Sequence, residues 1–137
     1  MRHWYYRGMK CILSILAGAA LALLVACGGG SDNVQSVQVS PSQAQGTAPK
    51  GAVNFTANGT FANSQSRLLT SQDGLMWSSS DTVVASINSL TGQATCLTAG
   101  SATITASVPS DLTFQGGGHT SSNQVTGTAS LQCIIPG

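Results

Sequence analysis

Residues 53–61 read VNFTANGTF. Apolar or small residues occupy the odd positions of this stretch and polar residues occupy the even ones, as in a strand with one buried and one wet face. The same alternation returns over 102–108 and 125–133. No window of helix length repeats apolar residues at three and four positions. The sequence therefore predicts an all-β domain in which 53–61 is one strand.

Shorter apolar runs, bounded by Gly, Pro, Asn and Asp, predict four further strands. They lie at 37–39 before Pro41, around Leu75 and Trp77, at 84–87, and at 94–97 after a turn signal at 90–92. About seven short strands with frequent turns predict a β-sandwich or a small barrel.

The first 26 residues have the three zones of a secretory signal peptide. Arg2, Arg7 and Lys10 precede an uncharged apolar run that ends in small residues. The run over 11–27 has 17 residues, which is short for a membrane-spanning helix of roughly 20 residues. We expect a cleaved signal peptide, and a retained transmembrane anchor is the alternative.

The end of this leader, Leu24-Val25-Ala26-Cys27, resembles the lipobox of bacterial lipoproteins. The resemblance implies cleavage before Cys27 and attachment of lipid to its thiol, and two or three acyl chains give stable membrane anchoring. Gly28 stands where Asp would retain a lipoprotein in the inner membrane, so the resemblance implies the outer membrane. We expect a signal peptide over 1–26, a lipidated Cys27 with a flexible tether over 27–33, and a domain over 34–137.

Several fragments of the domain resemble one family. In chain order they are Val39-Ser40-Pro41, Phe55-Thr56-Ala57, Trp77-Ser78-Ser79-Ser80-Asp81, Val84-Ala85-Ser86-Ile87 and the run AGSATITA over 99–106. Over 34–131 the chain is similar to the group 2 bacterial immunoglobulin-like domain. That resemblance implies a two-sheet immunoglobulin-like β-sandwich of the kind found in the intimin and invasin adhesins. The chain departs from the family in a longer segment over 109–124 and in Cys96, where the family tends to have a small residue.

Composition argues against two classes of function. From Cys27 onward the formal net charge is −2 and no basic patch occurs, so we expect no nucleic-acid partner. The chain has no Glu, both Tyr residues precede Cys27, and His119 is the one His after it. With so few groups to move protons, we expect no enzyme activity and no cofactor.

The surface is expected to be neutral and polar. Of the 111 residues from Cys27 onward, 48 are Ser, Thr, Asn or Gln. Low hydrophobicity with high net charge, the composition typical of disorder, is absent. A folded domain with such a surface suits hydrogen bonding to glycans or to another protein domain.

Cys96 and Cys133 are the two thiols that remain if Cys11 is removed and Cys27 carries lipid. Both lie on the apolar side of their predicted strands, and an exported protein meets an oxidising compartment. The sequence predicts a disulfide between them, with Cα atoms roughly 4.4 to 6.8 Å apart. Two separate buried thiols are the alternative, and no metal site is expected because two Cys and one loop His fall short of four ligands.

The candidate contact loop lies at 109–124 and contains Asp111, Phe114 and His119. Long connections can carry function, and a merely flexible loop is the alternative. Asp111, His119 and Ser121 are the residue types of a hydrolase triad, but one loop offers nothing to fix a nucleophile.

Trp77 is expected in the core, although a platform for stacking a sugar is the alternative. Asp81 is expected to cap a turn, with calcium binding as the alternative.

Together these features predict a non-catalytic lipoprotein of the bacterial cell envelope, anchored to the membrane through Cys27, whose domain binds a glycan or protein ligand in adhesion or surface recognition. The alternative is a structural accessory protein that binds another envelope protein through a sheet edge.

Overall fold

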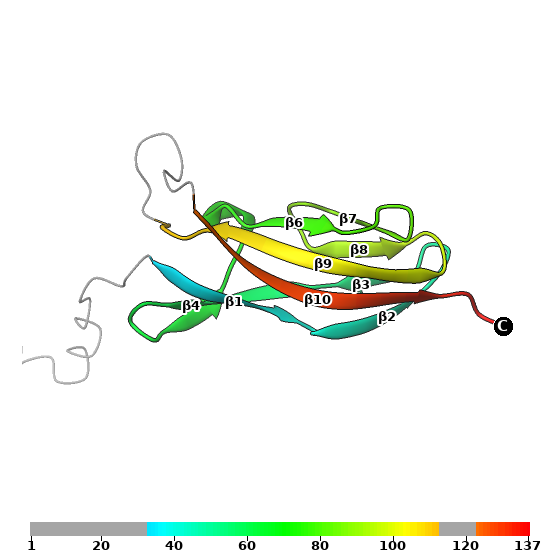
Figure 1. Ribbon diagram of the computed structural model, residues 1–137, viewed down its shortest axis with the longest axis horizontal. Helices are drawn as coiled ribbons and strands as arrows, with labels where there is room; N and C mark the ends of the chain where they lie inside the picture. The colour runs from blue at the N-terminus through cyan, green and yellow to red at the C-terminus, as the bar shows by residue number, and fades with distance from the viewer. Residues whose placement is uncertain (1–32, 113–122) are drawn as a thin grey trace, which may run out of the picture. The chain divides into compact units, whose positions relative to one another are not determined.

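The computed structural model describes residues 33–112 and 123–137 (Figure 1). Ser31–Gly137 forms one compact unit. Its described part contains ten strands and one short 3-10 helix, η2 (Ser71–Asp73). The strands are β1 (Val34–Ser40), β2 (Gln43–Thr47), β3 (Ala52–Asn54), β4 (Thr56–Phe61), β5 (Ser66–Leu68), β6 (Met76–Ser79), β7 (Ala85–Ile87), β8 (Gln93–Cys96), β9 (Gly100–Pro109) and β10 (Gln124–Ile134).

These strands form two layers that pack face to face. One layer is a four-stranded sheet in the order β2-β10-β9-β6. The other consists of two short sheets, β1-β4-β5 and β3-β8-β7, which follow one another because β3 and β4 are separated by Phe55 alone. Figure 1 shows β9 and β10 side by side, and their register runs from Gln124 opposite Pro109 to Cys133 opposite Gly100. The chain is therefore an all-β, immunoglobulin-like sandwich, as the sequence predicts.

The N-terminal part of the domain contributes one strand to each layer. β1 pairs with β4 in an antiparallel register, whereas β2 pairs with β10 in a parallel one. The chain changes layers at Pro41 and Ser42, between these two strands. Proline has no N–H to donate, so it ends the pairing of β1. Because consecutive strands pair in different layers, this part of the chain connects the two layers.

The core follows the predicted alternation. In β10, Gly127, Ala129, Leu131 and Cys133 are buried and the residues between them are exposed. β9 buries alternate residues from Ala102 in the same way. Across the described residues no polar or charged side chain is buried, so apolar burial drives the packing of the two layers. The largest fully buried side chains are those of Phe55, Ile104, Leu131, Val108, Cys96 and Cys133.

The core residues and the paired strands described above lie within 34–134. A chain that begins at Gly28 keeps every one of these contacts and has its own hydrophobic core, which is what an independently folding domain needs. No helix among the described residues has the length and apolar character to cross a membrane.

The strand count differs from the prediction at three places. The stretch over 53–61 is divided at Phe55: β3 pairs with β8, and β4 pairs with β1. The N–H of Phe55 donates to the carbonyl of Gly92 at 2.9 Å, in register with the pairs of β3 and β8. β2 and β5 are additional strands. In β2 only Gly46 is buried, and in β5 no residue is. Backbone pairing with β10 and β4 holds these two strands, so their sequences lack the alternation that would predict them.

Candidate functional site

Cys96 and Cys133 form the predicted disulfide. Their sulfurs are 1.93 Å apart and their Cα atoms 5.6 Å apart. Cys96 ends β8 in one layer and Cys133 lies in β10 of the other, so the bridge joins the two layers across the core. Both residues are buried. The bridge therefore serves the fold and offers no reactive thiol.

The ends of the candidate contact loop meet at one end of the domain. The N–H of Ser110 donates to the carbonyl of Asn123 at 2.9 Å, which closes the segment between them. Asp111, the one candidate of this loop that the structure describes, pairs with Asn33 in an antiparallel bridge. Phe114 and His119 lie outside the described residues, so their role in ligand contact stays a prediction.

Asn33 is also the residue through which the chain enters the domain. Its carbonyl accepts a hydrogen bond from the N–H of Ala62 at 3.0 Å. We call this region, made of Asn33, the 62–65 turn and the residues flanking the loop at 110–112 and 123, the tether end. The turns at 48–51 and 97–99 lie at the opposite end, because β9 spans the distance from Gly100 to Pro109.

Trp77 belongs to the core, as expected. Its side chain is 5% exposed, and its ring packs against that of Phe55 with centroids 6.5 Å apart and planes tilted by 40°. Gly92 approaches this pair closely: a Cβ there would lie 2.8 Å from the indole, and its φ of +75° suits glycine. The turn at 90–92 is thus pressed against the tryptophan.

A surface hollow of about 230 Å³ opens over this aromatic pair. It lies in the layer that Phe55 interrupts, between β5 and the 90–92 turn. Leu68 and Leu90 line the hollow and are 52% and 57% exposed. The sequence did not predict this site, because the residues come from five separate stretches that only the fold brings together. The lining consists of Phe55, Thr56, Ala57, Leu68, Leu69, Thr70, Ser71, Leu75, Trp77, Leu90 and Thr91.

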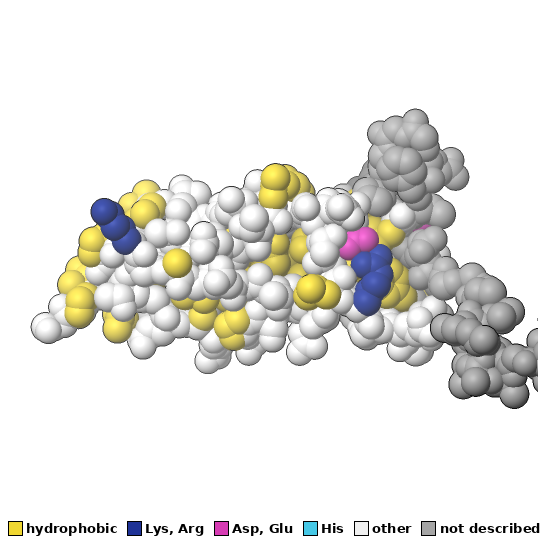
Figure 2. Space-filling model, turned by 180° about the vertical axis from the view of Figure 1, so that it is seen from behind, with side chains coloured by type: hydrophobic (Ala, Val, Ile, Leu, Met, Phe, Trp, Pro, Cys, Tyr) yellow, Lys and Arg dark blue, Asp and Glu magenta, His cyan; other side chains and the backbone are white. Residues whose placement is uncertain are grey.

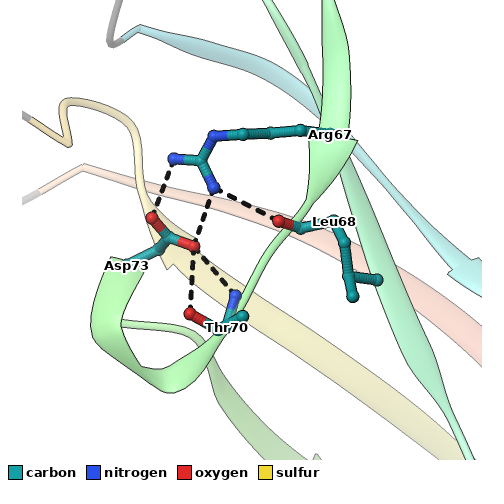
Figure 3. Close-up of polar contacts among 4 residues, drawn as sticks. All are labelled: Arg67, Leu68, Thr70 and Asp73. Carbon is teal, nitrogen blue, oxygen red and sulfur yellow. Dashed lines mark hydrogen bonds and ion pairs between the residues drawn. The ribbon is translucent and has the colours of Figure 1, made fainter.

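An ion pair stands beside the hollow (Figure 3). The guanidinium of Arg67 donates to both oxygens of Asp73, at 2.9 and 2.8 Å. The same guanidinium donates to the carbonyl of Leu68 at 3.2 Å and lies 5.0 Å from the centre of the Phe61 ring. The N–H of Thr70 donates to Asp73 at 2.9 Å, which caps η2.

These hydrogen bonds change the acidity of Asp73. The bond from Arg67 is the largest cause of a lowered pKa for the Asp73 carboxyl, and the N–H of Thr70 adds to the effect. Partial burial acts in the opposite direction and is outweighed. The pair is therefore charged at neutral pH, and its two charges compensate each other.

Asp81 caps a turn, as the sequence predicts. Its carboxylate accepts hydrogen bonds from the N–H groups of Val83 and Val84 at 3.0 and 3.3 Å. Within 33–112 and 123–137, no three His, Cys, Asp or Glu side chains come together as metal ligands would. The chemistry of the described surface is thus that of apolar contact and neutral hydrogen bonding.

Figure 2 shows the domain from behind, and few side chains on that side are charged. Hydrophobic side chains lie around the one place where a basic and an acidic group touch in that view. Most of the remaining surface in that view is neither hydrophobic nor charged, in keeping with a composition rich in Ser, Thr, Asn and Gln.

Of the comparisons with known proteins, the one with solved structures gives matches. No protein-family model matches the chain, and no curated protein matches it. Among solved structures, the chain is similar to the C-terminal 282-residue fragment of intimin, in complex with the intimin-binding domain of the translocated intimin receptor, Tir. The match has 18% sequence identity and a TM-score of 0.38, and covers 75% of this chain and 29% of that chain. The chain thus spans less than a third of the intimin fragment's length.

Proposed function

We propose that the chain is a lipoprotein of the bacterial cell envelope, in the outer membrane, whose domain, of the group 2 bacterial immunoglobulin-like type, recognises a macromolecular ligand without catalysing a reaction. The observation that carries this proposal is the join between anchor and domain. The lipobox ends at Cys27 and β1 begins at Val34. Only six residues separate the lipidated Cys from the first strand, which suits display of a folded domain close to a membrane.

The geometry of the domain supports display in one orientation. The chain enters at the tether end, and the ends of the 109–124 loop lie at that same end. A lipid anchor on Cys27 would hold this end near the membrane. The sides of the sandwich and the opposite end then face outward and are the surfaces available to a ligand.

The outward side chains of the sheets suit a neutral ligand. Opposite one another on the outer face of β9 and β10 lie Thr105 and Thr128, and Thr103 and Ser130. All four are polar and uncharged, and three are exposed, with Thr105 half-buried. Such a face can hydrogen-bond to a glycan or to a protein, and it lacks the cations that a polyanion requires.

The anchor is tested by replacing Cys27 with Ser. In a two-membrane bacterium the wild-type protein should be cleaved before Cys27 and carry acyl chains, whereas C27S should keep its leader and carry none. Mass spectrometry of the amino terminus distinguishes the two forms. An unmodified Cys27 in the wild type would refute the lipoprotein proposal and favour a transmembrane anchor instead.

Recognition is tested with a soluble chain that begins at Gly28. Retention of this chain on intact cells or on an immobilised glycan array supports recognition of an external ligand. Stoichiometric co-purification with one envelope protein, without retention on cells or glycans, supports the accessory role instead.

That second role has one structural observation in its favour. Each of the three described sheets ends in two strands that pair on one side only, and an edge strand can accept a partner strand. Strand β5 is one of these edges and pairs with β4 alone. In the register of β4 and β5 the N–H of Ser66 faces away from β4. Ser66→Pro would therefore remove a donor of the free edge, and it should abolish the co-purification if that edge is the one used.

A further inference from the structure

The hollow over Trp77 has an apolar floor and an apolar rim. Phe55, Leu75 and Trp77 lie at its floor and are buried. Leu68 and Leu90 stand at its rim and are more than half exposed. Exposed large apolar side chains are unremarkable when scattered singly. Here two of them flank an opening that leads to the core.

We infer that this hollow is the anchoring pocket for a protein ligand, and that it receives one uncharged apolar side chain, of the size of Leu, Met or Phe, that projects from the partner. This inference rests on the proposed recognition function and names the surface that performs it. The side chains that contribute most to protein binding tend to lie near the centre of an interface, in well-packed pockets from which water is excluded.

The size of the hollow sets the size of the group it receives. Its volume is about 230 Å³, and an apolar cavity of roughly 150 Å³ holds a benzene ring. One phenyl ring or one long aliphatic side chain therefore fits, and a second does not. A single methyl group would leave most of the hollow unfilled and would lose the dispersion contacts with Trp77 and Phe55.

The chemistry of the lining selects an uncharged and apolar group. No charged side chain lines the hollow, and its polar side chains are hydroxyls: those of Thr56, Thr70, Ser71 and Thr91. No amide or carboxylate is present to hydrogen-bond the hydroxyls of a sugar in pairs. The ion pair of Arg67 and Asp73 beside the rim compensates its own charges. A charged group would enter without a partner and lose its hydration.

The rim favours a protein over a small molecule. A small molecule that filled the hollow would leave the outer surfaces of Leu68 and Leu90 in water. A protein that inserts one side chain can cover both leucines with the atoms around that side chain, and such a ring excludes water from the central contact.

Trp77 provides the readout for the first experiment. The chain has two tryptophans, Trp4 and Trp77, so the soluble chain from Gly28 has Trp77 alone and shows a single indole N–H signal by NMR. N-acetyl-phenylalaninamide and N-acetyl-leucinamide should shift this signal, and the amide of Gly92, in a saturable manner at millimolar concentration. N-acetyl-glutaminamide should not. Absence of a saturable shift, or an equal shift with the glutamine probe, would overturn the inference.

A double variant tests the rim against a matched control. Leu68→Ser with Leu90→Ser should weaken binding of the phenylalanine probe about three- to tenfold, because apolar area is lost from the contact. Met76→Ser with Val83→Ser removes two side chains that are 49% and 69% exposed but do not line the hollow, and should leave the probe's affinity within about twofold. Equal losses in both double variants would overturn the inference. Unchanged unfolding midpoints show that both variants remain folded.

The partner is tested with a photo-crosslinking residue at position 90 and, separately, at position 76. The inference expects one protein to be crosslinked from position 90 and not from 76, and expects excess phenylalanine probe to suppress the crosslink. A small apolar molecule that co-purifies with the wild type and not with the Leu68/Leu90 variant would identify a small-molecule pocket and overturn the protein partner. If the soluble chain still binds cells while no probe binds the hollow, this inference fails and the proposed function stands.

Discussion

At the scale of single residues, Asp73 accepts hydrogen bonds from Arg67 and from the N–H of Thr70, and both stabilise its ionised form. Its pKa in the folded state lies below the value of about 3.9 in an unfolded chain. The stability gained from this difference is fully present above the unfolded pKa and is lost as the pH falls through the folded pKa. Asp73→Asn removes it at every pH.

We therefore expect Asp73→Asn to lower the free energy of unfolding by about 1 kcal/mol near pH 7, since Arg67 is half exposed and water screens the pair. The difference from wild type should stay constant above about pH 5 and shrink as the pH falls from about 5 to about 2. Urea unfolding at several pH values measures it. Arg67→Gln should show the same convergence, and a difference that stays constant with pH would contradict the assignment.

Gly46 lies opposite Cys133 in the register of β2 and β10. A Cβ at Gly46 would lie 2.7 Å from the sulfur of Cys96, closer than side-chain carbons approach. Gly46→Ala should therefore destabilise the domain by about 1 to 3 kcal/mol through overpacking. Part of this cost should disappear when both cysteines are replaced by Ala, because the sulfur is then absent.

Gly127 is the matched control for this prediction. A Cβ there would clash with the backbone carbonyl of Val37, so Gly127→Ala should cost the same with or without the cysteines. Both couplings are measured by thermal unfolding of Gly46→Ala and Gly127→Ala in the wild type and in the variant without cysteines, each compared with its own parent. An equal cost of Gly46→Ala in the two backgrounds would show that the disulfide is not what requires glycine at position 46.

At the scale of elements, the disulfide joins β8 of one layer to β10 of the other, and its cysteines are 37 positions apart in the sequence. In the chain-entropy model, a closed loop of this length stabilises a protein by about 4 kcal/mol. Reduction should lower the free energy of unfolding by an amount of that order, measured by urea unfolding with and without a thiol reductant. Non-reducing peptide mapping should recover the two cysteine peptides as one species. Full stability after reduction would mean that the layers hold together without the bridge.

The sequence predicted the strands in which buried and exposed side chains alternate. In β9 and β10 every second residue is buried, so Ala102, Ile104 and Leu131 reveal the strand, its face and the inward direction of the cysteines. β2 and β5 escaped prediction because backbone bonds to β10 and β4 hold them and burial hardly contributes. A backbone hydrogen bond to a strand elsewhere in the chain leaves no pattern in the local sequence.

The hollow escaped prediction for a related reason. Trp77 and Phe55 were correctly expected in the core, and 90–92 was correctly expected as a turn. The opening lies at Phe55, where the layer has an interruption between β3, which pairs with β8, and β4, which pairs with β1. That interruption depends on how two distant segments meet. Alternation alone predicted an unbroken strand over 53–61.

At the scale of the whole molecule, the tether end has a consequence for the candidate contact loop. The sequence alone offered 109–124 as the best surface for a ligand. In the fold, a segment that flanks this loop pairs with Asn33, where the tether ends and the domain begins. If Cys27 carries lipid, the loop begins and ends on the membrane side, and a distant ligand would meet the sides of the sandwich first. The hollow over Trp77 opens on one of those sides.

This orientation predicts different distances from the membrane for the two ends of the domain. Six tether residues reach at most about 20 Å when extended, and the ten residues of β9 separate the two ends by about 30 Å. Ala62→Cys places a dye in the 62–65 turn at the tether end, and Ala99→Cys places it in the 97–99 turn at the opposite end. Both alanines are exposed, so the two substitutions are matched.

In lipidated protein reconstituted into vesicles, energy transfer from the dye at position 62 to a headgroup-labelled lipid should clearly exceed transfer from position 99. The soluble chain from Gly28 should show little transfer from either position, which separates anchoring from adhesion of the domain to lipid. Equal transfer from both positions in the lipidated protein would mean that the domain lies flat on the membrane. In that case the tether end would be no closer to the membrane than the opposite end is. The 109–124 loop would then be as available to a ligand as the sides of the sandwich are.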